Sequence, residues 1–190
     1  MLRVIVALVL LTAANLPASA RSIHIVAFGD SATAGYLVPR QQAYPAQLQV
    51  LLRKKGYDVV VDNAGVNGDT TAGALRRFDA AIAPGTDIAI VEFGTNDLRL
   101  RVPQQRTRAN LNEIVHSLQK RGIAVLIVGL GSLNLADVAR ANGVLYAQWN
   151  LPPGKFRARD GAHFNAEGYA IVIAHMLPQI EELIARAGKR

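Results

Sequence analysis

The sequence contains no cysteine among its 190 residues, which excludes disulfide bonds, a thiol nucleophile and cysteine-ligated structural zinc. Aromatic residues are few, with one tryptophan and five tyrosines, so a platform for stacking sugars or bases is not indicated. No apolar run approaches the ~20 residues that a membrane-spanning helix needs. Apolar residues make up 51% of the chain, which is ample for one hydrophobic core that folds without covalent cross-links.

Residues 1–20 have the pattern of a removable secretory signal peptide. Arg3 precedes a short apolar run, and Ala18 and Ala20 are small residues of the kind that cleavage requires. The sequence therefore predicts an exported protein without a stable membrane anchor after cleavage, in which residues 21–190 form one domain. Retention of this segment as an anchor is the alternative.

The formal net charge of +7 comes from several short basic clusters. Such clusters can attract nucleic acid or anionic lipid. No interleaving of aromatic and basic residues and no nucleic-acid motif accompanies them, so we expect a solvated surface and no nucleic-acid partner. The clusters are Arg76–Arg77, Arg99 to Arg108, Arg157 to Arg159 and Lys189–Arg190.

Short apolar runs alternate with helical patterns along the chain. This alternation predicts an α/β fold, in which a parallel sheet lies between helical layers and ligands bind at the carboxyl ends of the strands. Asn165 is expected to cap the last helix and Pro178 to kink it. The predicted strands are residues 23–28, 57–61, 87–93, 123–130 and 144–149, and the earlier helices are residues 43–55, 70–81, 106–121 and 133–141.

Ser31 is the candidate nucleophile. It follows the first predicted strand in a turn of small residues, Gly29 to Gly35, which can project a hydroxyl toward substrate beside backbone N–H groups. A hydroxyl reacts only when a base takes its proton, and Asp160 and His163 in Asp-Gly-Ala-His can supply one. The same Asp-x-x-His spacing also fits a helix-entry turn or half of a metal site, although no further metal ligands lie beside it.

Gly68 and Asn96 are candidate oxyanion donors. Each follows a predicted strand, so the backbone N–H of Gly68, the side-chain amide of Asn96 and the backbone N–H of Ser31 can meet at one edge of the sheet. Taken singly, Gly68-Asp69-Thr70 also reads as a turn with a helix cap, and Gly94 to Asp97 as an ordinary turn after a strand.

Taken together, four stretches resemble the SGNH hydrolases, also called the GDSL esterase and lipase family. The stretches are Gly29-Asp30-Ser31 with Ala34-Gly35-Tyr36, Asn63 to Thr70, Gly94-Thr95-Asn96-Asp97 and Asp160-Gly161-Ala162-His163. The bacterial branch of thioesterases, lysophospholipases and arylesterases is the most similar.

The resemblance implies a flavodoxin-like three-layer α/β/α sandwich with a five-stranded parallel sheet. It implies hydrolysis of a small-molecule ester or thioester through an acyl-enzyme on Ser31, with no cofactor and no metal. Asp30 and Asp97 would be structural neighbours of the site. The protein would reside in the bacterial periplasm or be secreted, and its oligomeric state is left open.

One segment departs from that branch, because Gly131 to Asn142 is shorter than the helix-containing segment that borders the acyl pocket in those relatives. The short segment predicts an open groove with weak selectivity for long acyl chains. A carbohydrate O-deacetylase on the same fold is an alternative function, which the few aromatic residues do not favour. A binding protein without catalytic activity is a third, against which the presence of all five candidate site residues argues.

Overall fold

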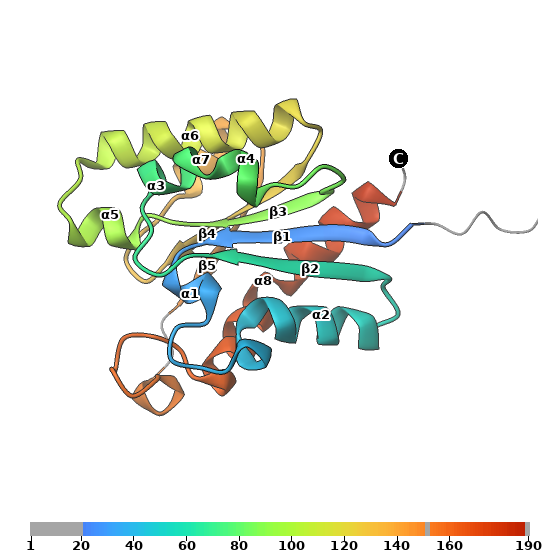
Figure 1. Ribbon diagram of the computed structural model, residues 1–190, viewed down its shortest axis with the longest axis horizontal. Coiled ribbons are helices and arrows are strands. Elements are labelled where there is room, and N and C mark those ends of the chain that lie inside the picture. The colour runs from blue at the N-terminus through green and yellow to red at the C-terminus, as the bar shows by residue number, and fades with distance from the viewer. Residues whose placement is uncertain (1–20, 151–152, 189–190) are drawn as a thin grey trace, which may run out of the picture.

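A five-stranded parallel sheet forms the centre of the molecule, with the strand order β2-β1-β3-β4-β5 (Figure 1). The computed structural model describes residues 21–150 and 153–188, so the predicted signal peptide lies outside the described residues. The strands are β1 (Ile23–Gly29), β2 (Val59–Gly65), β3 (Ile88–Glu92), β4 (Ala124–Leu130) and β5 (Leu145–Trp149). This order and the parallel pairing confirm the predicted flavodoxin-like α/β fold.

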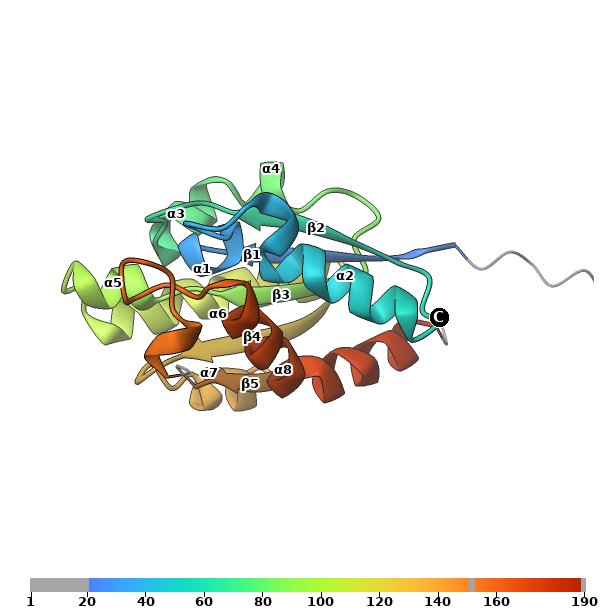
Figure 2. The same ribbon diagram turned by 90° about the horizontal axis from the view of Figure 1, so that it is seen from below.

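Helices cover both faces of the sheet and make the three layers of a sandwich. One face carries α2 (Tyr44–Lys54) and α8 (Ala166–Ala187), which lie in front of the sheet in Figure 2. The opposite face carries α3 (Thr71–Arg76), α4 (Phe78–Ala81), α6 (Gln104–Lys120) and α7 (Ala136–Ala141) (Figure 1). Two short helices, α1 (Ser31–Ala34) and α5 (Thr95–Arg99), follow β1 and β3, and 3₁₀ turns occupy Arg40–Gln42 and Gly154–Phe156.

Alternate residues of each strand enter the two hydrophobic cores. In β1, Ile25 and Ala27 pack with α2 and α8, whereas Val26 and Phe28 pack with α6 on the opposite face. Because both faces are covered, the central strands β3 and β4 read as nearly continuous apolar runs without a polar alternation. The sheet is therefore a rigid platform whose carboxyl edge carries the loops that bear the candidate site.

β2 extends to Gly65, beyond the predicted end at residue 61. Asp62 and Asn63 break its apolar pattern, but the strand pairs with β1 along its whole length, from Ile23 with Val59 to Gly29 with Gly65. Polar side chains are tolerated here because this edge of the sheet is incompletely covered, which leaves Asp62 exposed and Asn63 half-buried.

The helix predicted over residues 70–81 is interrupted at Arg77, which separates α3 from α4. Its guanidinium donates hydrogen bonds to the carbonyls of Gly29 and Ala64 and to the Asp69 carboxylate, so Arg77 joins the ends of two strands to the loop after β2. Arg77 is thus a structural cation rather than part of the solvated surface that its sequence cluster indicated.

The last helix, α8, begins where the sequence predicts. The Asn165 side chain accepts a hydrogen bond from the Gly168 backbone N–H, and the helix continues through Pro178 to Ala187. No helix within residues 21–150 and 153–188 has the length and apolar character to cross a membrane.

Candidate active site

Ser31 lies at the point where the strand order reverses, between the carboxyl ends of β1 and β3. It is the first residue of α1, and the Asp30 carboxylate caps this helix by accepting the Ala32 N–H at 2.9 Å. A Cβ atom at Gly29 would lie 2.0 Å from the Thr33 hydroxyl, so this tight passage from strand to helix requires glycine. The turn holds the serine hydroxyl at the edge of the sheet where such folds bind ligands.

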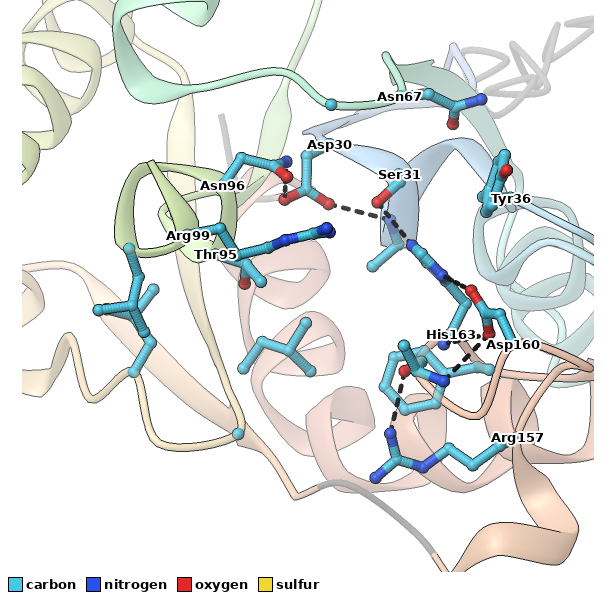
Figure 3. Close-up of a pocket in the computed structure, with 18 of the residues that line it drawn as sticks. Asp30, Ser31, Tyr36, Asn67, Thr95, Asn96, Arg99, Arg157, Asp160 and His163 are labelled. Carbon is cyan, nitrogen blue, oxygen red and sulfur yellow. Dashed lines mark hydrogen bonds and ion pairs between the residues drawn. The ribbon is translucent and has the colours of Figure 1, made fainter. Parts of the chain in front are cut away.

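The structure brings Ser31, His163 and Asp160 together, although Ser31 and His163 are 132 residues apart in sequence (Figure 3). Ser31 Oγ lies 2.9 Å from His163 Nε2, and His163 Nδ1 lies 2.5 Å from Asp160 Oδ2. The ring of Tyr36 packs against the imidazole, with 4.8 Å between ring centroids. This arrangement can pass the serine proton to the imidazole and stabilise the imidazolium that results.

A hydrogen-bonded turn before α8 fixes the imidazole. Asp160 Oδ1 accepts the backbone N–H groups of Ala162 and His163, each at 3.0 Å. Arg157 closes the turn by donating to the Ala162 carbonyl. The hydrogen bond from His163, followed by those two backbone N–H groups, holds the pKa of the Asp160 carboxyl well below its usual range. Asp160 is therefore ionised at any pH at which the imidazole can act as a base.

Two backbone donors are unused at this edge of the sheet. Within the described residues, the N–H groups of Ser31 and Gly68 have no acceptor, and both residues line the same pocket. Gly68 has φ +76°, and a Cβ atom there would meet nothing within 4 Å, so its backbone is open to the pocket. Such groups can receive the negative charge of a tetrahedral intermediate.

The Asn96 amide lies at the same place but is already engaged. Its Nδ2 donates to Asp30 Oδ2 at 3.0 Å and to the Asp69 carbonyl at 2.8 Å. These bonds aim the amide and restrict its rotation. They also mean that donation to an oxyanion requires one N–H to be shared with, or released by, one of its present acceptors.

These residues line an open pocket of about 910 Å³. Apolar side chains contribute much of its wall, including Leu98, Leu130, Leu133 and Phe164. Ser132 and Leu133 of the short segment after β4 border it, as the sequence led us to expect of that segment. Among the described residues, no group of three His, Asp or Glu side chains is placed to hold a metal ion.

Residues 27–171 match the GDSL-like lipase/acylhydrolase family. The chain belongs to this family. It is 36% identical over 150 residues to the esterase TesA of Pseudomonas aeruginosa, an alignment that covers 75% of this chain and 72% of that protein. It is 31% identical over 112 residues to an arylesterase of Vibrio mimicus, covering 58% of this chain and 56% of that protein, so the match spans about half of the arylesterase.

A solved structure agrees with this assignment. AlinE4, an esterase of the SGNH hydrolase family, superposes with a TM-score of 0.68 at 28% identity, covering 87% of this chain and 98% of that one. The resemblance predicted from the four sequence stretches is confirmed at the level of family and fold, and the named relatives support an ester hydrolase. The catalytic roles of the individual site residues stay predictions.

Asp97, next to Asn96 in the chain, binds the start of a neighbouring helix. Its carboxylate is buried and accepts the backbone N–H of Thr71 at 2.9 Å and the Thr71 hydroxyl at 2.5 Å. It therefore ties the start of α3 to α5.

Glu92 is a buried acid behind the turn that carries Ser31, and the sequence pattern indicated no role for it. Its Oε2 accepts the Thr33 hydroxyl at 2.9 Å and the Asp30 N–H at 3.4 Å, while Oε1 has no partner within the described residues. Burial, and then the nearby Asp30 carboxylate, raise the pKa of Glu92 well above its usual value. An acid at the end of an otherwise apolar strand, Ile88–Glu92, is the signal that could have revealed it.

Replacing Glu92 with glutamine should stabilise this GDSL-family fold increasingly as the pH rises. A carboxyl whose pKa is raised on folding keeps its proton when folded and loses it on unfolding, so its contribution to stability is lost above the usual glutamate pKa of about 4.3. The neutral amide is free of that penalty. Thermal unfolding at about pH 5 and about pH 8 should show the difference in Tm between variant and wild type growing with pH. Parallel curves would contradict this expectation, and Glu113→Gln, on the exposed face of α6, is the control.

Replacing Asn96 with alanine should lower kcat for ester hydrolysis by roughly 10²-fold with little change in KM, because a preorganised oxyanion donor acts mainly in the transition state. Steady-state kinetics on a p-nitrophenyl ester measures this. Asn67→Ala is the matched control, since Asn67 also lines the pocket but is exposed at its rim (Figure 3). Equal kcat values for the two variants would remove Asn96 from the oxyanion site.

Proposed function

We propose that the protein is an exported serine hydrolase that cleaves carboxylic esters or thioesters through an acyl-enzyme. The observation that carries the proposal is the hydrogen-bonded series from Ser31 Oγ to His163 Nε2, 2.9 Å, and from His163 Nδ1 to Asp160 Oδ2, 2.5 Å. The three side chains lie at the mouth of an open pocket, beside backbone N–H groups without acceptors.

In the first half of the reaction, Ser31 Oγ attacks the carbonyl carbon and its proton passes to His163 Nε2. The carbonyl oxygen becomes an oxyanion, which the N–H groups of Ser31 and Gly68 and the Asn96 amide stabilise. His163 then gives the proton to the departing alkoxide or thiolate, and the acyl group stays on Ser31. Asp160 keeps its charge and holds the imidazole in the tautomer that exposes Nε2.

In the second half, a water molecule attacks the acyl-enzyme and His163 accepts its proton. Collapse of the second tetrahedral intermediate releases the carboxylic acid and returns the proton to Ser31 Oγ. The same donors serve both intermediates, so no residue beyond these five is needed for the chemistry.

Arylesterase-like or thioesterase-like substrates fit the pocket better than acetylated carbohydrate. The aromatic residues that line the pocket outside the triad are Tyr36, which packs on His163, and Phe164, which is buried. Phe164 therefore offers no face to a sugar ring, and the exposed Tyr36 is a single ring that already contacts His163. The proposed export rests on the sequence pattern of residues 1–20 alone.

A panel of p-nitrophenyl esters from acetate to decanoate, with an acyl thioester added, tests the proposal. We expect hydrolysis that is greatest for short chains, because the short segment after β4 leaves the pocket open. Failure of a folded sample to hydrolyse any member would overturn the proposed activity. A strong preference for decanoate would overturn the short-chain assignment alone.

A further inference from the structure

Arg99 is a cation in the pocket that the proposed reaction does not use. It is the last residue of α5 and lies one helical turn after Asn96, so the two side chains share a face of this short helix. Arg99 lines the pocket, and Figure 3 shows its guanidinium extended into the cavity toward Ser31 and His163.

The charge of Arg99 has no partner within the described residues, where its guanidinium makes no hydrogen bond or ion pair. Asp30 and Asp160, the carboxylates that line the same pocket, are already engaged, Asp30 with Asn96 and Asp160 with His163. Neither carboxylate pairs with Arg99, so the pocket presents a guanidinium whose donors have no partner among the described residues.

Other arginines near the site are held by the protein. Arg77 is paired with Asp69, and Arg108, on α6, with Asp137. Arg157, across the pocket from Arg99, donates to the Ala162 carbonyl and supports the catalytic turn. Arg99 differs from them because its planar fork of donors faces the space that substrate would occupy.

We propose that Arg99 is a specificity-determining residue that selects esters carrying a carboxylate, phosphate or similar anion close to the scissile bond. The inference rests on the proposed hydrolase function. A guanidinium binds such groups with two parallel hydrogen bonds, which gives orientation as well as affinity. The open, partly apolar pocket then accepts the remainder of the substrate without strong selection for its length.

Matched ester pairs test this role through kcat/KM. Mono-p-nitrophenyl glutarate against p-nitrophenyl valerate places the charge on the acyl side, and p-carboxyphenyl valerate against its methyl ester places it on the leaving group. Arg99→Gln should lower the charged-to-neutral ratio about 5- to 10-fold for at least one pair, as expected for an exposed but bidentate ion pair. The pair that responds identifies the side on which the anion binds. Arg99→Lys should recover part of the ratio because it keeps the charge without the fork.

Arg101→Gln is the control, because Arg101 is exposed, lies two residues further on and does not line the pocket. It removes the same charge and should leave both ratios unchanged. Unchanged ratios in Arg99→Gln, or an equal loss in Arg101→Gln, would overturn the inference. Equal losses on charged and neutral esters would also overturn it, by giving Arg99 a role in the reaction itself. Absence of valerate hydrolysis by the wild type would instead overturn the proposed function.

Discussion

Replacing Ser31 with alanine should reduce kcat for ester hydrolysis by roughly 10⁴-fold or more, because the acyl group then has no oxygen to which it can transfer. The fold should be unaffected. Among the described residues, the Ser31 hydroxyl forms a hydrogen bond with His163 alone, and the hydrogen bonds that Ser31 accepts from Gly35 and Tyr36 are made by its backbone carbonyl. Steady-state kinetics and thermal unfolding measure the two effects separately.

Covalent labelling gives an independent readout of the same serine. Intact-mass spectrometry after treatment with a fluorophosphonate should show one adduct on the wild type and none on Ser31→Ala. Ser132→Ala is the matched control, because Ser132 is an exposed serine of the same pocket and should still give the adduct. An adduct that persists in Ser31→Ala, or wild-type-like turnover by it, would assign the nucleophile elsewhere.

Replacing His163 with alanine should also lower kcat by several orders of magnitude, since the serine then lacks a base and the leaving group lacks an acid. Asp160→Ala should cost less than this, because the imidazole can still accept a proton when it is held poorly. Kinetics of both variants on one p-nitrophenyl ester gives the ranking. His175→Ala, on the exposed side of α8, is the control for loss of an imidazole.

The ranking is what distinguishes the proposed roles. A larger loss in Asp160→Ala than in His163→Ala would contradict the assignment of His163 as the base. It would also point to collapse of the turn, since Asp160 additionally holds the backbone N–H groups of Ala162 and His163. Thermal unfolding of Asp160→Ala separates these two explanations.

Much of the architecture could be predicted from the sequence because buried parallel strands and long helices leave clear patterns. The run that forms β4 and the apolar stripe of α8 both lie within about two residues of the expected places. The short helices α1 and α5 were not predicted. Four or five residues show no periodicity, and these helices depend on contacts with the sheet, such as the cap that Asp30 provides.

The five predicted site residues could be chosen from the sequence by the chemistry of their side chains and backbone. They line one pocket because the parallel topology brings their loops to the same edge of the sheet. The engagement of the Asn96 amide, the burial of Glu92 and the direction of Arg99 could not be predicted in this way. The first two depend on residues distant in sequence, Asp30 for the amide and Thr33 for Glu92, and the direction of an exposed arginine leaves no pattern in the sequence. The net charge likewise gives only the excess of cationic over anionic residues, and not that Arg77 bonds two strand ends while Arg99 faces a cavity.

The loops at the carboxyl edge of the sheet differ in what they contribute to the pocket. The proposed nucleophile and oxyanion donors follow β1, β2 and β3, and the proposed base lies on the turn before α8, whereas the loop after β4 contributes only to the wall of the pocket, through Ser132 and Leu133. We expect changes in the length or polarity of that loop to alter which acids or alcohols fit, provided that Leu133 keeps its place against Gly94, just before Asn96. Insertions and deletions in the loop after β4 are therefore expected to change the range of substrates while the proposed hydrolysis reaction stays the same.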